Sequence, residues 1–529
     1  MLNGIKDWIE ARTGLVTFLE GFFEEEIPAS SGWHQVFGSM ALFSLVVQFL
    51  TGVLLAFNHS PQPGEAWYSV RYIMTEVSGG ALVRGLHHWG ASMMVILVVV
   101  HMVQVAIWGA YKKPREATWL VGVLLLLLTL AFGLTGYLLN WDNRAYWATV
   151  VTLQIMSLPP MVGELTLQLL GSEGGRVTAA TFQRFYAAHV ILLPAATAAL
   201  AGMHLYLVRK HGVAPQPGDE TKPKKQFYPE QVFKDSVAIF LAFAVLFGIA
   251  ATVEAPLGKL ADPNDISFVP RPEWYFLFLF QTLKFFEGSL EIVGAVILPT
   301  IAMLLLAALP FLDTGKLRKV SQRTAAIGIV ALCAIGWASL TGAALRSTPE
   351  ELPLAEGTGE AWTHATPAQL AGYAYFEQLE CGKCHNLAPG GEPAAGPTLT
   401  ALEEIDSAKL KAHIEEHAPA ANAVQKEALA VLSTGLQPSR AWAIADAPET
   451  ALAGAKLYQE NQCGMCHVTN GEGQTMGPPL NGEGGRRDAE WLAGHFREPQ
   501  KFVEGSMMPP YDFPEPQMTA IVDYMRALP

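Results

Sequence analysis

Residues 87–101 read HHWGASMMVILVVVH, and His87 and His101 lie 14 residues apart within one apolar run. A second apolar run holds His189 and His204, 15 residues apart. At about 100° and 1.5 Å per residue, each pair stays on roughly one face of a helix, about 21–22 Å apart in depth. Ionisable side chains inside a membrane are costly and usually functional. Two such helices facing each other predict two haem sites, each iron taking one histidine from each helix. His88 is a rival for His87 that does not keep the spacing.

Glycines repeat the same step in two further apolar runs. They are separated by 14 residues in each run: Gly38 and Gly52, then Gly122 and Gly136. Glycine lets a flat macrocycle approach a helix backbone closely. Small residues also serve helix packing in membranes, but the recurrence of the step on both runs favours the haem interpretation.

The composition divides the chain into a membrane half and a water-soluble half. Of 529 residues, 51% are hydrophobic and 16% are charged, and the long apolar runs stop near residue 345. The net charge of −13 argues against nucleic acid as a partner. Seven runs are long enough to cross a bilayer of about 30 Å. They are 34–57, 89–110, 118–139, 184–207, 233–253, 289–311 and 323–344.

Basic loops orient the predicted spans. Lysine and arginine cluster in three connections, at 112–115, 209–225 and 316–323, and all three fall on one side of the membrane. The positive-inside rule therefore places the N-terminus in the cytoplasm and the C-terminal half outside. The N-terminus lacks the pattern of a cleavable signal peptide, so we expect the first span to direct insertion. Residues 1–27 alternate apolar and charged side chains and predict an interfacial helix.

The water-soluble half contains an internal repeat at an offset of 82 residues. The matching stretches are Gly372…Phe376…Cys381-Gly-Lys-Cys384-His385 and Gly454…Tyr458…Cys463-Gly-Met-Cys466-His467. A Cys-x-x-Cys-His motif attaches haem through two thioether bonds and supplies an axial histidine. A bare Cys-x-x-Cys also suits zinc or redox chemistry, but the added histidine and the repeat favour two covalent haems c. By resemblance to small cytochromes c, the Pro397 and Pro478 carbonyls accept the axial ring N–H.

The sixth ligands of the two predicted haems c differ. In the second copy, Met508 precedes a proline in a stretch that resembles the methionine loop of small cytochromes c, with Met507 as its alternative. The first copy has no methionine between residues 386 and 464, and His413 and His417 are the available side chains there. That haem is either bis-histidine with a lower potential, or lacks a strong sixth ligand.

The run from His87 to His101, followed by Lys113-Pro-Arg-Glu-Ala-Thr-Trp119, resembles the cytochrome b family of quinol-oxidising complexes. The likeness is greatest to the chloroplast and cyanobacterial type, here fused to a part like that family's subunit IV. It implies that His87 pairs with His189 on an outer haem b, and His101 with His204 on an inner one. It also implies that Arg84 and Arg184 lie near haem propionates. The chloroplast type holds an extra haem through a cysteine; Val36 stands at the matching position, so we expect no covalent extra haem.

A quinol-oxidation site is implied by Pro272-Glu273-Trp274-Tyr275, which resembles the family's signature. Oxidising a quinol needs a proton acceptor, and a carboxylate beside aromatic walls suits that role. Glu273 is the predicted acceptor, with Tyr275 and Tyr137 nearby. The stretch 140–147 resembles the opposite wall, although Asn140 replaces the usual proline. A second quinone site near the inner haem is also implied, for which the sequence offers Arg209, Lys210 and Asp235.

We therefore predict an all-α protein: a seven-span transmembrane bundle followed by two small all-α cytochrome c domains. The expected segments are 1–27 interfacial helix, 28–215 dihaem core, 216–345 subunit-IV-like part, 346–365 linker, and cytochrome c domains at 366–445 and 446–529. The resemblance implies an electron-transfer subunit of a bacterial inner-membrane respiratory complex, coupled to proton translocation. Its partners would be quinone, a Rieske iron–sulfur protein, other subunits, a cytochrome acceptor and a second copy of the chain. The alternatives are a conduit serving another dehydrogenase or reductase, and a transporter with haem as a sensor.

Overall fold

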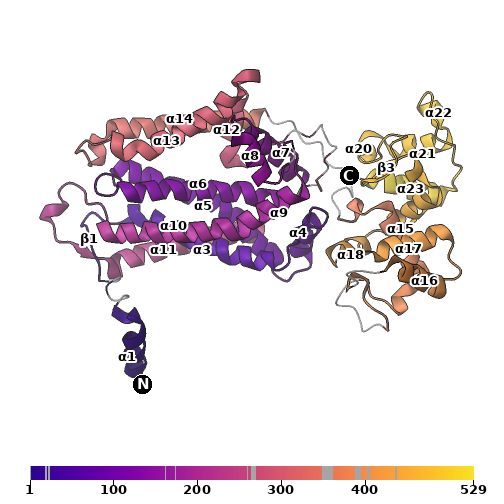
Figure 1. Cartoon of the computed structure of the whole chain (residues 1–529), viewed down its shortest axis with the longest axis horizontal. Helices are drawn as coiled ribbons and strands as arrows, with labels where there is room; N and C mark the ends of the chain where they lie inside the picture. Colours follow the sequence, from indigo (N-terminus) through magenta and orange to yellow (C-terminus); the bar gives the residue numbers. More distant parts are fainter. Residues whose placement is uncertain are drawn as a thin grey trace. The chain divides into compact units, whose positions relative to one another are not determined.

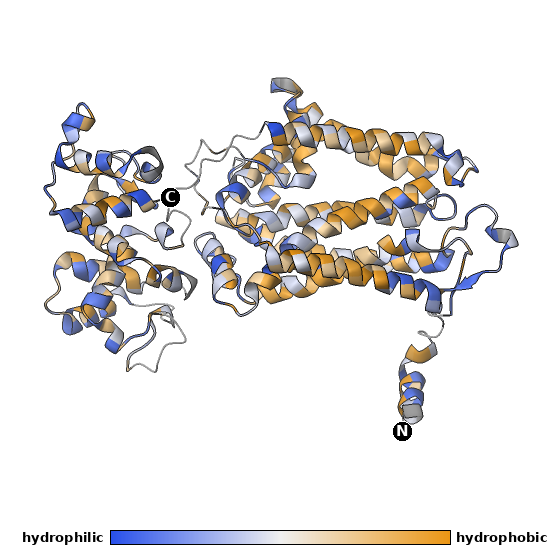
Figure 2. Cartoon of the chain, turned by 180° about the vertical axis from the view of Figure 1, so that it is seen from behind, coloured by the Kyte–Doolittle hydropathy of each residue, from blue (hydrophilic) through white to orange (hydrophobic). Residues whose placement is uncertain are grey.

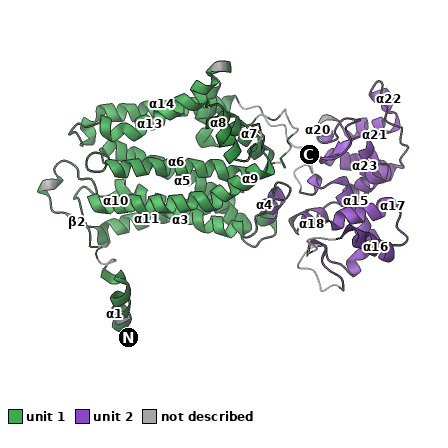
Figure 3. Cartoon of the chain, viewed as in Figure 1, with its two compact units in different colours: residues 1–63, 73–349 green, residues 64–72, 350–529 purple. Residues whose placement is uncertain are grey.

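The computed structural model divides the chain into two compact units, residues 1–63 with 73–349 and residues 64–72 with 350–529 (Figure 3). It describes all residues except 1, 18–20, 22–23, 161, 173, 259, 262, 264–267, 269, 348–360, 388–394, 402–405, 435, 437 and 529. The first unit contains the apolar spans and the second contains the Cys-x-x-Cys-His repeat. Each unit is described separately below.

Seven helical segments of the first unit are long and apolar enough to cross a membrane, which confirms the predicted fold class (Figures 1 and 2). They are η1 and α3 (Trp33–Ala56), α5 (Gly80–Trp108), α6 (Glu116–Leu138), α9, η2 and α10 (Ala179–His211), η4 and α11 (Phe227–Thr252), η7 and α13 (Val293–Leu312), and α14 (Thr324–Arg346). Their apolar side chains face outward along the bundle, as expected of helices solvated by lipid.

Several helix starts differ from the sequence-based spans, and two of them, those of α5 and α9, show why. Helix α5 begins at Gly80 instead of residue 89, after Gly79 with φ +74°. The fourth span begins at Ala179 instead of 184, where Thr178 caps α9. Arg84 in the first of these extensions and Gln183 in the second lower the local hydropathy. The helical backbone therefore continues past the point where the apolar run ends.

The N-terminal segment is only partly the helix expected over 1–27. Helix α1 covers Leu2–Thr13 and is followed by Gly14 with φ +63°. Strand β1 (Glu26–Ile27) then pairs antiparallel with β2 (Lys225–Gln226). Glycine in the left-handed region is a common helix end. Phe18, Leu19, Phe22 and Phe23, part of the predicted amphipathic pattern, lie outside the described residues.

The three basic loops lie at one end of the bundle, beside the β1–β2 pair (Figure 1). Arg115 donates to the carbonyls of His211 and Gly212 at 2.8 and 3.0 Å, joining the first loop to the second. Lys112 forms an ion pair of 2.7 Å with Asp313, joining the first loop to the third. Short helices gather at the opposite end: α7 (Asn143–Ser157), α8 (Val162–Leu169) and α12 (Leu277–Leu283). Helix α4 (Ala66–Thr75) is a further short helix that the hydropathy pattern did not predict.

Each copy of the repeat contains two helices that pack together closely at a glycine. In the first copy, α15 (Pro367–Gln378) crosses α17 (Ala423–Ser433), and a Cβ at Gly372 would lie 2.4 Å from the Ala428 carbonyl oxygen. In the second copy, α19 (Glu449–Glu460) crosses α23 (Glu515–Ala527), and a Cβ at Gly454 would lie 2.4 Å from the Ala520 oxygen. The repeated glycine is therefore a packing requirement.

Shorter elements complete the second unit. The first copy contains η9 (Ala361–His364), η10 (Cys381–Lys383), η11 (Leu399–Ala401), α16 (Ser407–His417) and α18 (Pro438–Ala445). The second contains η12 (Cys463–Met465), β3 (Val468–Thr469), β4 (Glu472–Gly473), α20 (Glu483–Arg486), α21 (Ala489–Arg497) and α22 (Pro499–Phe502).

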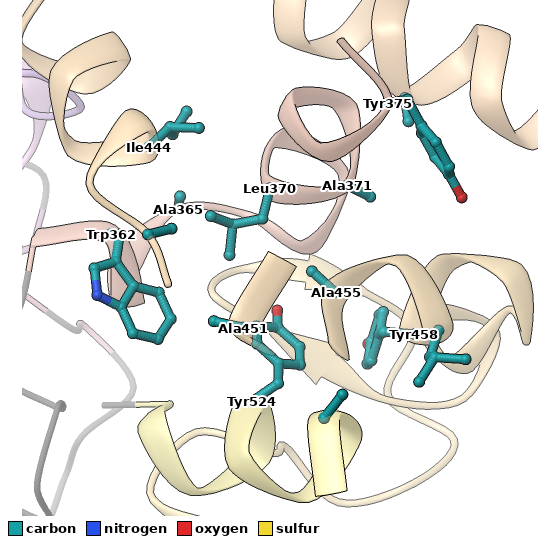
Figure 4. Close-up of a cluster of buried hydrophobic side chains, with 14 of the residues drawn as sticks. Trp362, Ala365, Leu370, Ala371, Tyr375, Ile444, Ala451, Ala455, Tyr458 and Tyr524 are labelled. Atoms are coloured by element: carbon teal, nitrogen blue, oxygen red, sulfur yellow. The ribbon is translucent and has the colours of Figure 1, made fainter. Parts of the chain in front are cut away.

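The two copies share one hydrophobic core, in which Tyr375 of the first copy and Tyr458 of the second are both buried (Figure 4). Across the junction, the Tyr375 hydroxyl donates to Glu460 Oε1 at 3.0 Å and Lys456 donates to Gln378 at 2.6 Å. Trp362 also belongs to this core, so the predicted linker of 346–365 ends earlier than expected. Its residues 348–360 lie outside the described part of the chain.

Candidate haem and quinol sites

The four membrane histidines come together in two pairs. The ring centres of His87 in α5 and His189 in η2 (Ala188–Leu192) are 6.3 Å apart, and those of His101 in α5 and His204 in α10 are 6.5 Å apart. Two imidazoles bound to opposite faces of one metal, each at about 2 Å, place their ring centres roughly 6 Å apart. His88 instead packs edge-on against Trp89, with centres 4.7 Å apart. The pairing is the one that the resemblance implied.

Each of the four predicted glycines faces one of these histidines. A Cβ built on the glycine would approach the ring Cε1 at 3.2 Å for Gly52 and His87, 2.5 Å for Gly136 and His189, 3.3 Å for Gly38 and His101, and 3.4 Å for Gly122 and His204. A larger residue would press on the imidazole and on any flat group that it ligates. The two histidine pairs and their glycines therefore fit two haems b.

Two threonines beside the pair of His87 and His189 were not predicted as site residues. Thr51 Oγ1 lies 2.9 Å from His87 Nδ1, and Thr135 Oγ1 lies 3.0 Å from His189 Nδ1. Both directly precede a glycine of the 14-residue step, Gly52 and Gly136. The repeated Thr-Gly dipeptide was the signal that could have identified them.

The two predicted propionate partners are arginines held by backbone carbonyls. Arg84 is buried and donates to the carbonyls of Ala255 and Pro256 at 2.5 and 2.6 Å. Arg184 donates to the carbonyls of Gln168 and Leu169. Arg84 precedes His87 by three residues, and Arg184 precedes His189 by five. Their role toward a haem propionate stays a prediction.

In the first cytochrome c copy, the structure separates the two histidines left open by the sequence. The His385 ring lies 5.6 Å from the His413 ring at 83°, whereas His417 stacks behind His413 at 4.1 Å. His417 Nδ1 also lies 3.0 Å from the His413 carbonyl oxygen, which ties it to its own helix. On the other side, His385 Nδ1 lies 3.0 Å from the Pro397 carbonyl, as predicted. His413 is therefore the side chain placed to face His385.

In the second copy, His467 Nδ1 lies 2.8 Å from the Pro478 carbonyl, which again confirms the expected contact between the ring and this carbonyl. Met507 is 86% exposed, whereas Met508 packs against the shared core. This favours Met508 over Met507 as the side chain available to a haem. The Cys381, Cys384, Cys463 and Cys466 thiols are unpaired, as thioether attachment requires.

His495 in α21 is a third residue that was not predicted from the sequence. It lies 82 residues after His413, the offset of the repeat itself. Its ring stacks on Trp491 with centres 4.9 Å apart, and burial together with nearby His467 lowers its pKa. Both copies thus carry a histidine at one repeat position, and only the second also carries the methionine.

The predicted quinol site brings a carboxylate, a cation and two phenols together. Burial raises the pKa of Glu273, while Arg144 acts to lower it and Asp142 adds to the rise. Tyr275 is buried next to Gly133, where a Cβ would lie 2.7 Å from the phenol oxygen. Tyr137 lies 5.9 Å beneath the Arg144 guanidinium. Glu273, Arg144 and the two tyrosines therefore lie close together in surroundings of low dielectric constant, where each group affects how readily its neighbours bind a proton.

Trp274 and Pro272 complete the signature. The Trp274 indole N–H donates to Ser92 Oγ of α5 at 3.1 Å, and the ring packs edge-on against Tyr275 with centres 5.4 Å apart. Pro272 lies in the extended segment before η5 (Trp274–Phe276). The indole bond ties the signature to the helix that carries His87 and His101.

The opposite wall takes a defined shape despite Asn140. Trp141 adopts a left-handed backbone with φ +50°, and Asp142 then caps α7 by accepting from Ala145 N at 2.7 Å. Asp142 also accepts from Gly258 N at 3.0 Å. Burial raises the pKa of Asp142, and the two amide bonds oppose that rise. A capping carboxylate thus fixes the turn next to Arg144.

The three residues offered for an inner quinone site have separate contacts. Asp235 accepts from Ser39 Oγ at 2.9 Å and from Gln231 Nε2 at 2.8 Å, beside Gly38. Arg209 forms an ion pair with Glu25, and Lys210 lies 5.9 Å from the Tyr206 ring. Asp235 is the one whose contacts lie next to the inner histidine pair.

Comparison with known proteins agrees with this arrangement. Three family models match: "Cytochrome b/b6/petB" over residues 25–212, "Cytochrome b(C-terminal)/b6/petD" over 259–355 and "Cytochrome c" over 451–529. The menaquinol:cytochrome c reductase cytochrome b subunit of Bacillus subtilis is 40% identical over 221 residues, which are 40% of this chain and 99% of that protein. Cytochrome b6 of Synechococcus sp. (strain JA-3-3Ab) is 38% identical over 213 residues, again 40% of this chain and 99% of that protein.

Among solved structures, a chain of a hyperthermophilic respiratory Complex III matches with a TM-score of 0.59 and 28% identity, covering 65% of this chain and 92% of that one. Two curated relatives are thus covered along almost their whole length at an identity well above 30%. The chain is a multi-pass membrane protein that belongs to the cytochrome b/b6 family, continued by a b6/petD-type segment and a cytochrome c segment.

Proposed function

We propose that this chain is the quinol-oxidising subunit of a quinol:cytochrome c-type oxidoreductase. The observation that carries the proposal is the meeting of four histidines in two pairs, with ring centres 6.3 and 6.5 Å apart, on helices tied to the Glu273 cluster. The relatives named for menaquinol:cytochrome c reductase and for Complex III support the same activity.

Two haems b would be held by His87 with His189 and by His101 with His204. Two haems c would be attached through Cys381 and Cys384, and through Cys463 and Cys466, with His385 and His467 as axial ligands. When bound, these groups supply one-electron transfer across the membrane and outward. No cysteine precedes Cys333, so the chain offers no thioether anchor for an extra haem in its cytochrome b part.

The protein's own contribution at the quinol site is to position the substrate and accept its proton. Glu273 accepts a proton from a quinol hydroxyl, and Tyr275 and Trp274 exclude water around it. The positive charge of Arg144 stabilises the Glu273 carboxylate before the transfer. Protonation of Glu273 then removes this charge interaction. Tyr137 offers a second phenol whose oxygen is buried and has no hydrogen-bond partner in the described part of the chain.

The remaining assignments concern the assembly. A quinol gives up two electrons, one of which would enter the haems b. The other needs a high-potential acceptor, which we infer to be an iron–sulfur protein of the Rieske type contributed by another subunit. The basic loops at one end of the bundle favour a cytoplasmic face there, which places the Glu273 cluster at the outer face of a bacterial inner membrane. A homodimer, a cytochrome acceptor and proton translocation follow from the resemblance to the family.

The test is a redox-titrated haem spectrum of the purified protein, followed by addition of a quinol with and without an outer-site quinol analogue. We expect two haems b and two haems c per chain, and b-haem reduction that the analogue and Glu273→Gln both slow. A third covalent haem would contradict the haem assignment. Reduction that neither change affects would indicate a conduit without quinol oxidation.

A further inference from the structure

The structure assigns to Thr51 and Thr135 a role in distinguishing the two histidine pairs. We propose that their hydroxyls hold the outer pair, His87 and His189, in the proton form that binds metal, and that these two bonds lower the midpoint potential of a haem bound there. The inference rests on the proposed haem sites but not on quinol oxidation.

The direction of each hydrogen bond follows from a second bond to the same hydroxyl. Thr51 Oγ1 lies 2.7 Å from the Val47 carbonyl oxygen, and Thr135 Oγ1 lies 2.8 Å from the Ala131 carbonyl oxygen. A carbonyl can only accept, so each hydroxyl proton is used there. The threonine oxygen must then accept from the imidazole. This puts the ring proton on Nδ1 and leaves the Nε2 lone pair free for a metal.

The two threonines act from opposite sides of the outer position. Thr51 lies on α3 and reaches His87 of α5, whereas Thr135 lies on α6 and reaches His189 of η2. In both cases the following residue is the glycine that faces the same ring. In each Thr-Gly dipeptide, the threonine therefore accepts the hydrogen bond from the ring Nδ1–H, and the glycine leaves space beside the same ring.

The inner pair lacks this arrangement. The residues before Gly38 and Gly122 are Phe37 and Val121, which have no hydroxyl. In the part of the chain that the structure describes, His101 Nδ1 and His204 Nδ1 are buried without a hydrogen-bond partner. A backbone group of Thr118 acts on the His204 ring, and backbone groups of Gln48 and Phe132 act on the two outer rings in the same way. The threonine hydroxyls are therefore the contacts that the inner pair lacks. The residue that precedes each glycine therefore distinguishes the two positions. It is threonine at the outer pair and phenylalanine or valine at the inner pair.

A consequence for electron affinity follows from the basicity of the ligands. An acceptor on Nδ1–H makes an imidazole a stronger donor at Nε2, and a stronger donor stabilises the more highly charged metal. Two such bonds act on the outer position, and the inner histidines lack threonine acceptors. We therefore expect the two threonine bonds to lower the midpoint potential of the outer haem relative to the same haem without them.

The experiment is a redox titration of the two haems b in purified full-length protein carrying Thr51→Val or Thr135→Val. Each variant should raise the reduced-to-oxidised ratio of the outer haem at a fixed poise by about threefold to tenfold, where tenfold is 59 mV for one electron. The inner haem should not shift. His189→Ala identifies the outer signal as the one that it removes.

The chain offers two matched controls. Thr129 lies on the same helix as Thr135, is also buried, and donates to the Leu125 carbonyl at 2.9 Å without a histidine contact. Thr129→Val should leave both potentials unchanged. Thr51→Ser keeps the hydroxyl and should stay close to the wild type, and Thr51→Ala should shift if the valine variant cannot be purified.

The outcomes separate this inference from the proposed function. Equal shifts of both haems, no shift of the outer haem, or the same shift in Thr129→Val would overturn the role of the two threonines. If the wild-type protein contained no pair of b-type haems, the haem assignment itself would fail. If both haems b were present with an unshifted outer haem in the variants, only the threonine assignment would fail.

Discussion

Glu273 is the residue on which the proposed quinol chemistry depends. Its carboxyl group is half-buried among Arg144, Asp142 and Tyr275, and it is the base that the site offers to a quinol hydroxyl. Replacing it by glutamine keeps the volume but removes the base, so Glu273→Gln should lower kcat for quinol oxidation by about 10²-fold. Haem midpoint potentials should not change. Glu287→Gln, at an exposed glutamate of the same region, should keep the wild-type rate.

The pH dependence has a sign fixed by the surroundings of this carboxyl. The charged form accepts the proton, and burial raises the pKa of Glu273, so activity should fall with decreasing pH at a higher pH than for a solvated glutamate. Arg144 opposes the rise. Arg144→Gln should therefore raise this pKa further and move the acid limb of kcat/KM to higher pH. A limb that moved to lower pH would contradict the pairing of these charges.

His413 and His417 show what a sequence can name and what only packing can choose. Both are histidines four residues apart on one helix, and nothing in their spacing ranks them. The structure places the His413 ring 5.6 Å from the His385 ring and puts His417 behind it. His413→Ala should convert the first haem c to a high-spin form in visible and electron paramagnetic resonance spectra. His417→Ala should leave it low-spin, and the reverse result would exchange the two assignments.

At the scale of the elements, the 14-residue glycine step is a property of two helices, α3 and α6. A Cβ at Gly136 would lie 2.5 Å from the His189 ring, so Gly136→Val should reduce b-type haem from two per chain to about one. Gly248 of α11 has no atom within 4 Å of such a Cβ. Gly248→Val should retain both haems by pyridine haemochrome assay. Equal loss in the two variants would indicate general damage to the bundle.

The helices also differ in how well they could be predicted from the sequence. The seven spans were predictable because about twenty consecutive apolar residues allow little else. The polar start of α5 at Gly80 and the short helices α4, α7 and α8 were not, because they carry no long apolar run and are fixed by caps such as Asp142 and by tertiary packing. The meeting of four histidines in two pairs was predictable from their spacing. Thr51 and Thr135 were not, since their role depends on a hydrogen bond across two helices.

At the scale of the whole molecule, the cytochrome c unit suggests a direction for electron flow. The two copies share one core through α15 and α19, so their motifs are held at a fixed separation. A histidine faces His385 in the first copy, and Met508 is available to the second. Methionine ligation raises a haem potential relative to bis-histidine ligation. Electrons entering the first copy would therefore move downhill to the second and leave from there.

Met508→His tests this direction in the complete protein. Exchanging the methionine for histidine should lower the midpoint potential of the second haem c towards that of the first and remove the downhill step. Reduction of an external cytochrome acceptor should then slow, while quinol-dependent reduction of the haems b continues at the wild-type rate. Met507→His, at an exposed neighbour, is the matched control and should change neither rate. If Met508→His left the second potential unchanged, the ligand would lie elsewhere, and His495, at the repeat position of His413, would be the side chain to replace next.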